Sequence, residues 1–548
     1  MQTHWSVDSK SWIYTLLIVV SLGCCHVSIA QVTEVAATTV SAATVPATRV
    51  SAATKPSLQP PNVILILADD LGFGELGCYG QTLIKTPNID RLAQGGMRFS
   101  NFYAGSTVCA PSRCVLMTGL NTGRCTVRGN TDKSRRHLQS LQASDWTIAK
   151  LLSARGYETA MIGKWGLGEL DQPGRPLLQG FDNYFGYVNQ VHAHNYFPKT
   201  LIENDQMVTL NNPTTFANPE LGDDGGGYLD VAKLAPEQLL TSQYTPDVFI
   251  EKSIEFLTKS HDRPFFLYLP FTLPHTNNEL RRATGIGAEI LSTGSYQNEL
   301  WSEADRKHAA MITKLDEGIG RIVDHLKRIG IDKNTLVLFT SDNGPQKESQ
   351  HNVSLFEPAG PFRGMKRSLN DGGIRVPLIA SWPNRIPVNS VSDHLCYAGD
   401  MMATLSELTA PSSAGNNMPA DLDSISLLPT LTKSELSAQL TPFGAYWQQF
   451  SNDQLVMANS SEQKKHEYLY WEFYEEGSRA AVRFGSWKLI EEPMLSGQLS
   501  LYDLSSDIDE SKNVMEQNPE IVAIGLKHIQ AGHHDNPDWT VAPKPLRK

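Results

Sequence analysis

Three short apolar runs, far apart in the chain, constrain its fold more than any other feature. They are Val63–Leu67, Phe265–Leu269 and Leu336–Phe339, each continuous and of strand length. Such runs are typical of strands that are buried on both faces, as in parallel sheets covered by helices. Between them lie helical patterns of apolar residues, over Ile148–Leu152 and Glu303–Ile329. The alternation predicts an α/β fold with a large, mostly parallel sheet sandwiched by helices.

The rest of the chain divides into smaller parts. Residues 198–246 are rich in Gly, Asn and Pro and fit neither pattern, so we expect a long insertion over the sheet that shapes ligand choice. Near the end, 480–490 and 499–502 predict antiparallel strands, and about 519–531 predicts a helix. We therefore predict a large domain over residues 62–435 and a smaller subdomain, of antiparallel sheet plus helix, over residues 436–548.

The N-terminus is predicted to direct export. Lys10 precedes an apolar run, Trp12–Leu22, and Ser28–Ala30 forms a small-x-small cleavage site. We expect residues 1–30 to be a signal peptide, because the run is too short and wrongly flanked for a stable membrane span. Residues 31–61 are mostly Ala, Thr, Val, Ser and Pro without aromatic side chains, which predicts a disordered linker. The mature protein is thus expected to be periplasmic or secreted.

Net charge and cysteine content narrow the class of protein. A formal net charge of −11 on 548 residues argues against a nucleic-acid binder, because that affinity depends on clustered Lys and Arg. Of seven cysteines, Cys24 and Cys25 would leave with the signal peptide, and the residues before them fit a lipid anchor poorly. Five cysteines remain, so in an oxidising compartment at least one thiol lies outside any disulfide framework. The disulfide pairing is left open.

The stretch with the most chemical information is Cys-Ala-Pro-Ser-Arg, residues 109–113. Pro111 suits the first position of a helix, where its missing N–H would be unpaired in any case. Unpaired backbone donors and the positive end of the helix dipole would then face Cys109, which suits an anion such as a sulfate ester. On these residues alone, a packed or disulfide-bonded thiol is an equally good interpretation.

Two pairs of oxygen-bearing side chains follow predicted strands. Asp69 and Asp70 come after the first strand, and Asp342 and Asn343 come after the third of the apolar runs. In open α/β sheets, ligands bind beyond the carboxyl ends of the strands. Three carboxylates with an amide oxygen form a ligand set suited to Ca²⁺ or Mg²⁺. Independent turns or helix caps are the alternative for each pair.

A GxGxxG string runs from Gly72 to Gly77, directly after the first predicted strand. Such a string is typical of the phosphate-binding loop of dinucleotide-binding folds. Here Asp69 and Asp70 stand between the strand and the glycines, where they would repel a pyrophosphate. We therefore favour a metal site over a dinucleotide site.

The segment from Cys109 to Arg124 resembles the signature of the type I sulfatases, which are arylsulfatase-like, formylglycine-dependent members of the alkaline phosphatase superfamily. Four further stretches match the same family in the same order, and together they cover almost everything from about Asn62 to Asp538. The resemblance implies that Cys109 is converted to formylglycine (3-oxoalanine) by a formylglycine-generating or anaerobic maturation enzyme. A hydroxyl of the hydrated aldehyde would attack the sulfur of a sulfate ester.

The resemblance also implies roles for residues at matching positions. The implied ligands of one Ca²⁺ are Asp69, Asp70, Cys109 (as formylglycine), Asp342 and Asn343. Lys164, in the stretch Gly163–Gly168, and Lys366 would bind the sulfate group. His275 matches the histidine that protonates the leaving-group oxygen, and Arg113 would support the formylglycine and the metal ligands.

The chain departs from the family pattern at two positions. In many relatives a histidine stands where this chain has Gly166, so the group that takes the proton from the formylglycine hydroxyl is open. The family usually has Glu at the position of Asp371. A string of polar residues comprises Gln190, His192, His194, Asn195 and Tyr196. It either lines the substrate pocket or forms an ordinary polar loop.

Together these matches predict an enzyme that hydrolyses sulfate esters and releases inorganic sulfate. Its substrate would be a small-molecule or carbohydrate sulfate ester, and the sequence does not choose between aryl, steroid and carbohydrate sulfates. One rival is a phosphate or phosphonate monoester hydrolase on the same fold. The other is a non-catalytic ligand-binding homologue in which Cys109 stays a thiol or forms a disulfide.

Overall fold

The computed structural model describes residues 60–131, 133–213, 216–217, 227–228, 233–259, 261–410, 419, 421–432 and 462–541. The predicted signal peptide, nearly all of the predicted linker and the predicted boundary at 435/436 lie outside these residues. Within the described part of the chain, no helix combines the length and apolar character needed to span a bilayer.

A ten-stranded sheet forms the centre of the large domain, in the order β13-β2-β12-β11-β1-β10-β4-β5-β6-β7. Its middle consists of five parallel strands, which are β11 (Thr335–Ser341), β1 (Asn62–Ala68), β10 (Phe265–Pro270), β4 (Glu158–Lys164) and β5 (Asn183–Tyr187). Leu65 of β1 pairs with Tyr268 on one side and Leu338 on the other. The three apolar runs are therefore adjacent strands, and the predicted mostly parallel sheet is confirmed.

Antiparallel strands complete both edges of this sheet. Beyond β11 lie β12 (Leu378–Ser381), β2 (Met97–Phe99) and β13 (Ser390–Ser392), of which β12 is antiparallel to both neighbours. Beyond β5 lie β6 (Thr200–Glu203) and β7 (Gln206–Thr209), joined as a hairpin. Residues 198–246, which we expected to lie over the sheet as an insertion, instead extend the sheet at their start, through these two strands. Their apolar residues are too few and too short in run to stand out by pattern.

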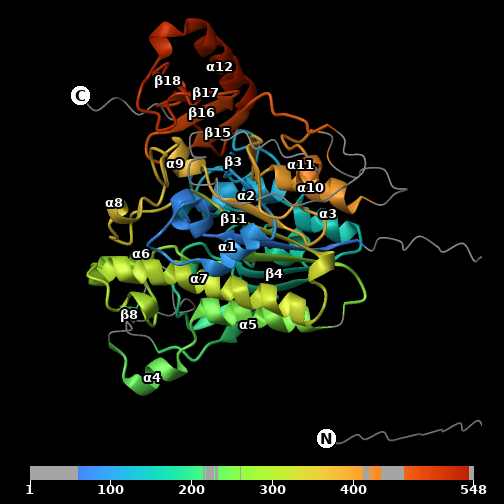
Figure 1. Cartoon of the computed structure of the whole chain (residues 1–548), viewed down its shortest axis with the longest axis vertical. Coiled ribbons are helices and arrows are strands. Elements are labelled where there is room, and N and C mark those ends of the chain that lie inside the picture. Colours follow the sequence, from blue (N-terminus) through green and yellow to red (C-terminus); the bar gives the residue numbers. More distant parts are fainter. Residues whose placement is uncertain are drawn as a thin grey trace, which may run out of the picture. The chain divides into compact units, whose positions relative to one another are not determined.

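Two helical layers cover the two faces of the sheet. Val63, Leu65 and Leu67 of β1 belong to one core cluster, and Ile64 and Ile66 belong to the other, as the alternation of side chains along a strand requires. The first core contains α2 (Cys109–Thr118), α3 (Ile148–Ala154) and α10 (Asp400–Thr409). The second core contains α1 (Pro87–Gln94), α5 (Thr245–Thr258) and α7 (Glu303–Arg328). Figure 1 shows α5 and α7 on one side of the strands and α2, α3 and α10 on the other.

The C-terminal part is a second, smaller sheet with one helix, as predicted. Its strands are antiparallel neighbours in chain order, namely β15 (Leu469–Phe473), β16 (Arg479–Phe484), β17 (Trp487–Glu491) and β18 (Leu499–Asp503). Helix α12 (Pro519–Gly532) packs its apolar side chains on them. The segment predicted as one strand over 480–490 is two strands, because Gly485 turns the chain with a φ of 54°.

Short elements connect these layers. The helical ones are η1 (Phe73–Glu75), η2 (Gly77–Tyr79), η3 (Lys133–Leu138), η4 (Pro176–Gln179), η5 (His192–His194), α4 (Pro236–Thr241), α6 (Asn278–Thr284), η7 (Gly294–Tyr296), η8 (Asp332–Asn334), α8 (Val353–Phe356), α9 (Asp371–Ile374), α11 (Leu428–Thr432) and η10 (Met515–Gln517). The extended ones are two strand pairs, β3 (Phe102–Tyr103) with β14 (Cys396–Tyr397) and β8 (Phe216–Ala217) with β9 (Gly227–Tyr228).

Candidate active site

Four neighbouring parallel strands end at the same edge of the sheet, and each delivers polar side chains there. Asp69 and Asp70 follow β1, and Asp342 and Asn343 follow β11. Lys164 is the last residue of β4, and the loop after β10 carries a histidine, described below. Because ligand sites of α/β sheets form at the carboxyl ends of strands, this edge is the candidate active site.

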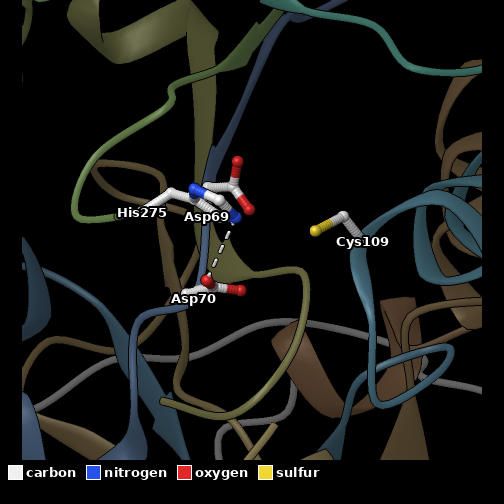
Figure 2. A group of neighbouring side chains, drawn as sticks. All are labelled: Asp69, Asp70, Cys109 and His275. Atoms are coloured by element: carbon white, nitrogen blue, oxygen red, sulfur yellow. Dashed lines mark ion pairs between the residues drawn. The ribbon is translucent and has the colours of Figure 1, made fainter. Parts of the chain in front are cut away.

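Cys109 faces this edge from the first residue of α2. Its side chain belongs to a group with Asp69, Asp70 and His275, in which one ligand atom from each residue lies within 4.8 Å of the others. Figure 2 shows the sulfur pointing toward the three other side chains. The helix begins at Cys109 itself, so the prediction that Pro111 is the first helical residue was wrong by two positions. Pro111 still lies in the first turn, where its missing N–H breaks no helical hydrogen bond.

Cys109 is an unbridged thiol. All five cysteines among the described residues, Cys78, Cys109, Cys114, Cys125 and Cys396, are free and buried. Burial raises the pKa of the Cys109 thiol to about 12, although the positive charges of Lys164 and Lys366 oppose the shift. Since the thiolate is the nucleophilic form of cysteine, the unmodified side chain is a poor nucleophile at neutral pH.

The four predicted oxygen ligands lie together and are almost completely buried. The backbone N–H of Asp70 donates to Oδ1 of Asp342 at 3.1 Å, and Nδ2 of Asn343 donates to Oδ1 of Asp70 at 2.7 Å. Two further oxygens, Oδ1 of Asp69 and Oδ1 of Asn343, are buried and have no hydrogen-bond partner within the described chain. Buried oxygens without a partner are costly, and a hard cation such as Ca²⁺ would satisfy both of them. The residues at this edge therefore fit the metal that the sequence predicted.

Burial and neighbouring charges shift the pKa values of these carboxyl groups in different directions. Burial and the nearby charge of Asp69 raise the pKa of Asp342 to about 7, and burial also raises the pKa of Asp70. For Asp69, burial opposes ionisation, but the charges of Lys164, His275 and Arg113 outweigh it and lower the pKa. Neighbouring carboxylates of this kind stay ionised together only when cations offset their repulsion.

Arg113 supplies part of the compensating charge. It donates to Oδ2 of Asp342 through Nε at 3.0 Å and through Nη2 at 2.8 Å, and it lies 3.5 Å from Oδ2 of Asp69. Its Nη1 donates to the backbone carbonyl of Lys164 at 2.5 Å. Burial lowers the pKa of Arg113, but the carboxylates of Asp342 and Asp69 outweigh that and raise it. Arg113 thus connects α2 with the ends of β4 and β11.

Two lysines place their ammonium groups in the site. Lys164 forms an ion pair with Oδ2 of Asp69, and neither side chain is exposed. Nζ of Lys366 lies 2.7 Å from Oδ2 of Asp70 and 3.2 Å from Nε2 of His275. The two ammonium groups lie near the thiol and supply hydrogen-bond donors and positive charge that suit a tetrahedral anion.

His275 completes the group and is joined by residues that the sequence left undecided. Its ring is buried, and Nε2 lies 3.4 Å from Oδ2 of Asp70. The ring of His194 stacks on it, and the hydroxyl of Tyr196 donates to the backbone carbonyl of His275 at 2.7 Å. Glu279, which pairs with His194, was missed, because nothing in the sequence links two residues that lie 85 positions apart.

The end of the Gln190 side chain occupies the space beside Gly166, at the position where many relatives carry a histidine. The φ of Gly166 is 77°, and a Cβ atom there would lie 2.4 Å from Oε1 of Gln190. That oxygen is buried and has no hydrogen-bond partner within the described residues. The carboxamide of Gln190 therefore fills the space beside Gly166, but an amide does not accept a proton as a base does.

The GxGxxG string does not form a phosphate-binding loop. It folds into η1 and η2 instead of entering a long helix. A Cβ on Gly74 would lie 2.3 Å from the carbonyl oxygen of Glu357, and one on Gly72 would lie 2.1 Å from that of Pro358. These glycines are needed because another part of the backbone packs directly on them.

Comparison with known proteins agrees with this geometry. A protein-family model described as Sulfatase matches residues 61–411. The N-acetylgalactosamine-6-sulfatase of Canis lupus familiaris is 31% identical over 437 residues, covering 76% of this chain and 74% of the relative. The N-acetylgalactosamine-6-O-sulfatase of Bacteroides thetaiotaomicron is 29% identical over 514 residues, covering 85% and 91%. Human arylsulfatase A is 30% identical over 504 residues, covering 86% and 87%.

Solved structures show the same fold. The crystal structure of Ps i-CgsB superposes with a TM-score of 0.65 at 25% identity, covering 88% of this chain and 94% of that one. A phosphonate monoester hydrolase of Agrobacterium radiobacter, with a TM-score of 0.54 at 20% identity and coverage of 87% and 96%, shares the fold alone. The chain belongs to the sulfatase family of the alkaline phosphatase superfamily and is a sulfatase, an enzyme that hydrolyses sulfate esters.

Proposed function

We propose that this sulfatase acts on sulfated carbohydrates, and that it uses a formylglycine made from Cys109 together with one bound Ca²⁺. The observation that carries the proposal is the position of Cys109, a free thiol grouped with two carboxylates and a histidine at the carboxyl ends of the central strands. A thiol with a pKa of about 12 has little nucleophilic character at neutral pH, which supports a modified side chain as the reacting group. The names of the two N-acetylgalactosamine sulfatases support a carbohydrate substrate.

The proposed Ca²⁺ ligands are Asp69, Asp70, Asp342, Asn343 and the modified Cys109. The two unpartnered oxygens of Asp69 and Asn343 support this assignment. When bound, the ion would polarise the sulfate oxygens and the hydroxyl of the hydrated aldehyde.

The remaining side chains would bind and orient the substrate. The ammonium groups of Lys164 and Lys366 pair with Asp69 and Asp70 in this structure. They would bind and neutralise the sulfate oxygens of the substrate. Arg113 would hold Asp342 and the strand end at Lys164 in place. His275 would give a proton to the leaving-group oxygen as the bond from sulfur to that oxygen breaks.

The proposal includes the location of the enzyme and its maturation. A signal peptide over residues 1–30 and a linker over 31–61 would place the catalytic domain, 62–435, and the C-terminal subdomain, 436–548, in the periplasm or outside the cell. A maturation enzyme of the formylglycine-generating or anaerobic type would have to act on Cys109.

Two experiments test the proposal. Purified enzyme is assayed with 4-nitrophenyl sulfate and with a panel of sulfated monosaccharides, beside a Cys109→Ala variant. We expect sulfate release by the wild type alone, with the highest kcat/KM on a sulfated sugar. Equal release by both proteins would exclude Cys109 as the source of the nucleophile. Intact mass of the peptide that contains residue 109 reports the modification directly, because the aldehyde is lighter than the thiol.

A matched pair of substrates tests the rival function, a phosphate or phosphonate monoester hydrolase on the same fold. The sulfate and the phosphate monoester of one alcohol are compared at equal concentration. We expect kcat/KM to favour the sulfate ester, and a preference for the phosphate or a phosphonate ester would favour the monoester hydrolase instead.

A further inference from the structure

The polar contacts of His275 fix only one side of its ring. Nε2 lies near Nζ of Lys366 and Oδ2 of Asp70, at 3.2 and 3.4 Å, whereas Nδ1 is buried and has no hydrogen-bond partner within the described residues. The backbone is held by the hydroxyl of Tyr196, which donates to the carbonyl at 2.7 Å. Rotation about the bond between Cβ and the ring is intrinsically broad for histidine, so neither contact defines the plane of the ring.

The ring of His194 supplies the missing restraint. It lies parallel to the His275 ring, with centroids 4.5 Å apart and an angle of 14° between the planes. Rotating the His275 ring out of its plane would drive an edge into this neighbour, because packed interiors leave no free space for such a movement. The stack therefore keeps Nε2 directed toward Lys366 and Asp70.

Glu279 in turn fixes the ring of His194. Its Oε2 lies 3.0 Å from Nδ1 of His194, and the two side chains are only 11% and 12% exposed. Burial opposes ionisation of Glu279, but the hydrogen bond and charge of His194 outweigh it and lower the pKa of Glu279. An ionised carboxylate accepts a hydrogen bond from Nδ1, which defines both the tautomer and the orientation of the imidazole, as carboxylates do for histidines in other catalytic sites.

One segment of the chain, at the start of α6, carries two residues of this arrangement. His275 and Glu279 lie four residues apart on either side of the cap of α6, whose first turn contains Glu279. Asn277, the cap residue, accepts a hydrogen bond from the backbone N–H of Leu280 at 3.0 Å and so anchors α6 beside the strand end. One short segment therefore holds both the buried histidine and the carboxylate that orients its neighbour.

We propose that His194, oriented by Glu279, is a positioning residue for His275 and thereby determines how well the enzyme cleaves sulfate esters with poor leaving groups. The inference rests on the proposed role of His275 as the proton donor. A leaving group that is a stable anion, such as 4-nitrophenolate, needs little protonation as its bond to sulfur breaks. A sugar alkoxide or an unsubstituted phenolate needs a correctly placed donor, and that step is worth about 10²–10⁴-fold in rate.

The test compares leaving groups across a set of variants. Rates with 4-nitrophenyl sulfate and phenyl sulfate, at equal enzyme concentration, are measured for wild type, His194→Ala, His194→Phe, Glu279→Gln and His275→Ala. We expect His194→Ala to lose at least ~10-fold more kcat/KM on phenyl sulfate than on 4-nitrophenyl sulfate. His194→Phe, which keeps a flat ring for the stack, should recover most of that difference, and Glu279→Gln should fall between the two.

Further readouts separate positioning from damage to the fold. A double variant, His194→Ala with His275→Ala, should show no more leaving-group dependence than His275→Ala alone, because both changes act on one donor. Melting temperature and calcium binding are measured for each variant, and His194→Phe together with Glu279→Gln carry the test if His194→Ala does not fold.

The outcomes distinguish the two proposals. A His275→Ala variant whose loss is equal on both esters overturns the proposed proton donor and this inference with it. Leaving-group dependence in His275→Ala, combined with equal losses on both esters in His194→Ala, overturns the role of His194 alone.

Discussion

Lys488 of β17 places its ammonium group 2.8 Å from Oδ1 of Asp371, and neither side chain is exposed to solvent. Asp371 begins α9, five residues after Lys366, so this pair joins the C-terminal sheet to the segment that delivers a lysine to the active site. Glu510 adds to the junction, with one oxygen 3.1 Å from Nζ of Lys488 and another accepting from the backbone N–H of Asp371 at 2.6 Å. The C-terminal sheet therefore supports the catalytic edge of the large domain.

Replacing Lys488 with methionine should destabilise the whole enzyme. The change leaves the buried carboxylates of Asp371 and Glu510 without their ammonium partner, which typically costs about 3–5 kcal/mol. Because Asp371 keeps Arg375 at 3.1 Å, we expect a value near the lower end. Urea denaturation followed by tryptophan fluorescence measures the loss. The matched control is Arg321→Met, which breaks an exposed pair with Glu251 and should cost less than ~1 kcal/mol.

Removal of calcium should lower both activity and stability. A ligand that binds only the folded state at about 100 times its Kd adds about 2.7 kcal/mol, so dialysis against EGTA should lower the melting temperature and added Ca²⁺ should restore it. Asp342→Asn should abolish this calcium-dependent shift, whereas Asp324→Asn, at a half-exposed helix position, should retain it. Equal shifts in both variants would place the ion elsewhere.

Lys366 should contribute to catalysis far more than to folding. Its substitution by methionine removes a charge that would face the sulfate as negative charge develops, and losses of one such contact are about 10²–10³-fold in kcat. Steady-state kinetics on the best sulfated sugar measure the effect. Lys347→Met changes an exposed lysine that, like Lys366, lies between β11 and β12, and it should leave kcat/KM within about twofold. A similar small effect for Lys366→Met would remove it from the sulfate site.

Glu75 should make stability fall as pH rises toward neutrality. Its Oε1 lies 2.6 Å from Nε2 of His308, and burial raises the pKa of Glu75 to about 7. A carboxyl whose folded pKa is raised contributes stability below the unfolded pKa near 4.5, and this contribution is lost as pH rises through about 7. The loss is on the order of 3 kcal/mol.

A Glu75→Gln variant isolates that contribution. Melting temperatures of wild type and variant are compared at pH 5, 6, 7 and 8 with calcium held constant. We expect the advantage of the wild type over the variant to shrink from pH 5 to about pH 7 and to change little from there to pH 8. A constant difference would show that Glu75 ionises in the folded state as it does in the unfolded chain.

The sequence predicted the sheet and the positions of most site residues because both depend on local patterns. Continuous apolar runs identified β1, β10 and β11, and the polar residues just beyond them had to lie at one edge once the strands were parallel. The edge hairpin β6–β7 was missed, because edge strands bury less and show weaker alternation. The two-residue turn after Phe484 was also missed, since the apolar residues on either side read as one run.

The contacts that orient the site residues were not predictable in the same way. The stack of His194 on His275 joins residues that are 81 positions apart, and no periodicity or spacing connects them. Likewise, Asp371 and Lys488 are 117 positions apart, and each resembles an ordinary surface residue by composition. Such pairings depend on how loops pack after the sheet has formed, which a pattern of apolar residues does not encode.

The burial of Cys109 sets an order of events during biogenesis. Its side chain is 1% exposed in the finished fold, among the carboxylates of Asp69 and Asp342 and the ammonium groups of Lys164 and Lys366. No second protein could close its own active site around that atom once the polypeptide has collapsed. The maturation enzyme proposed for Cys109 would therefore have to meet a nascent or unfolded chain, and a molecule that folds before that meeting would keep the unmodified thiol.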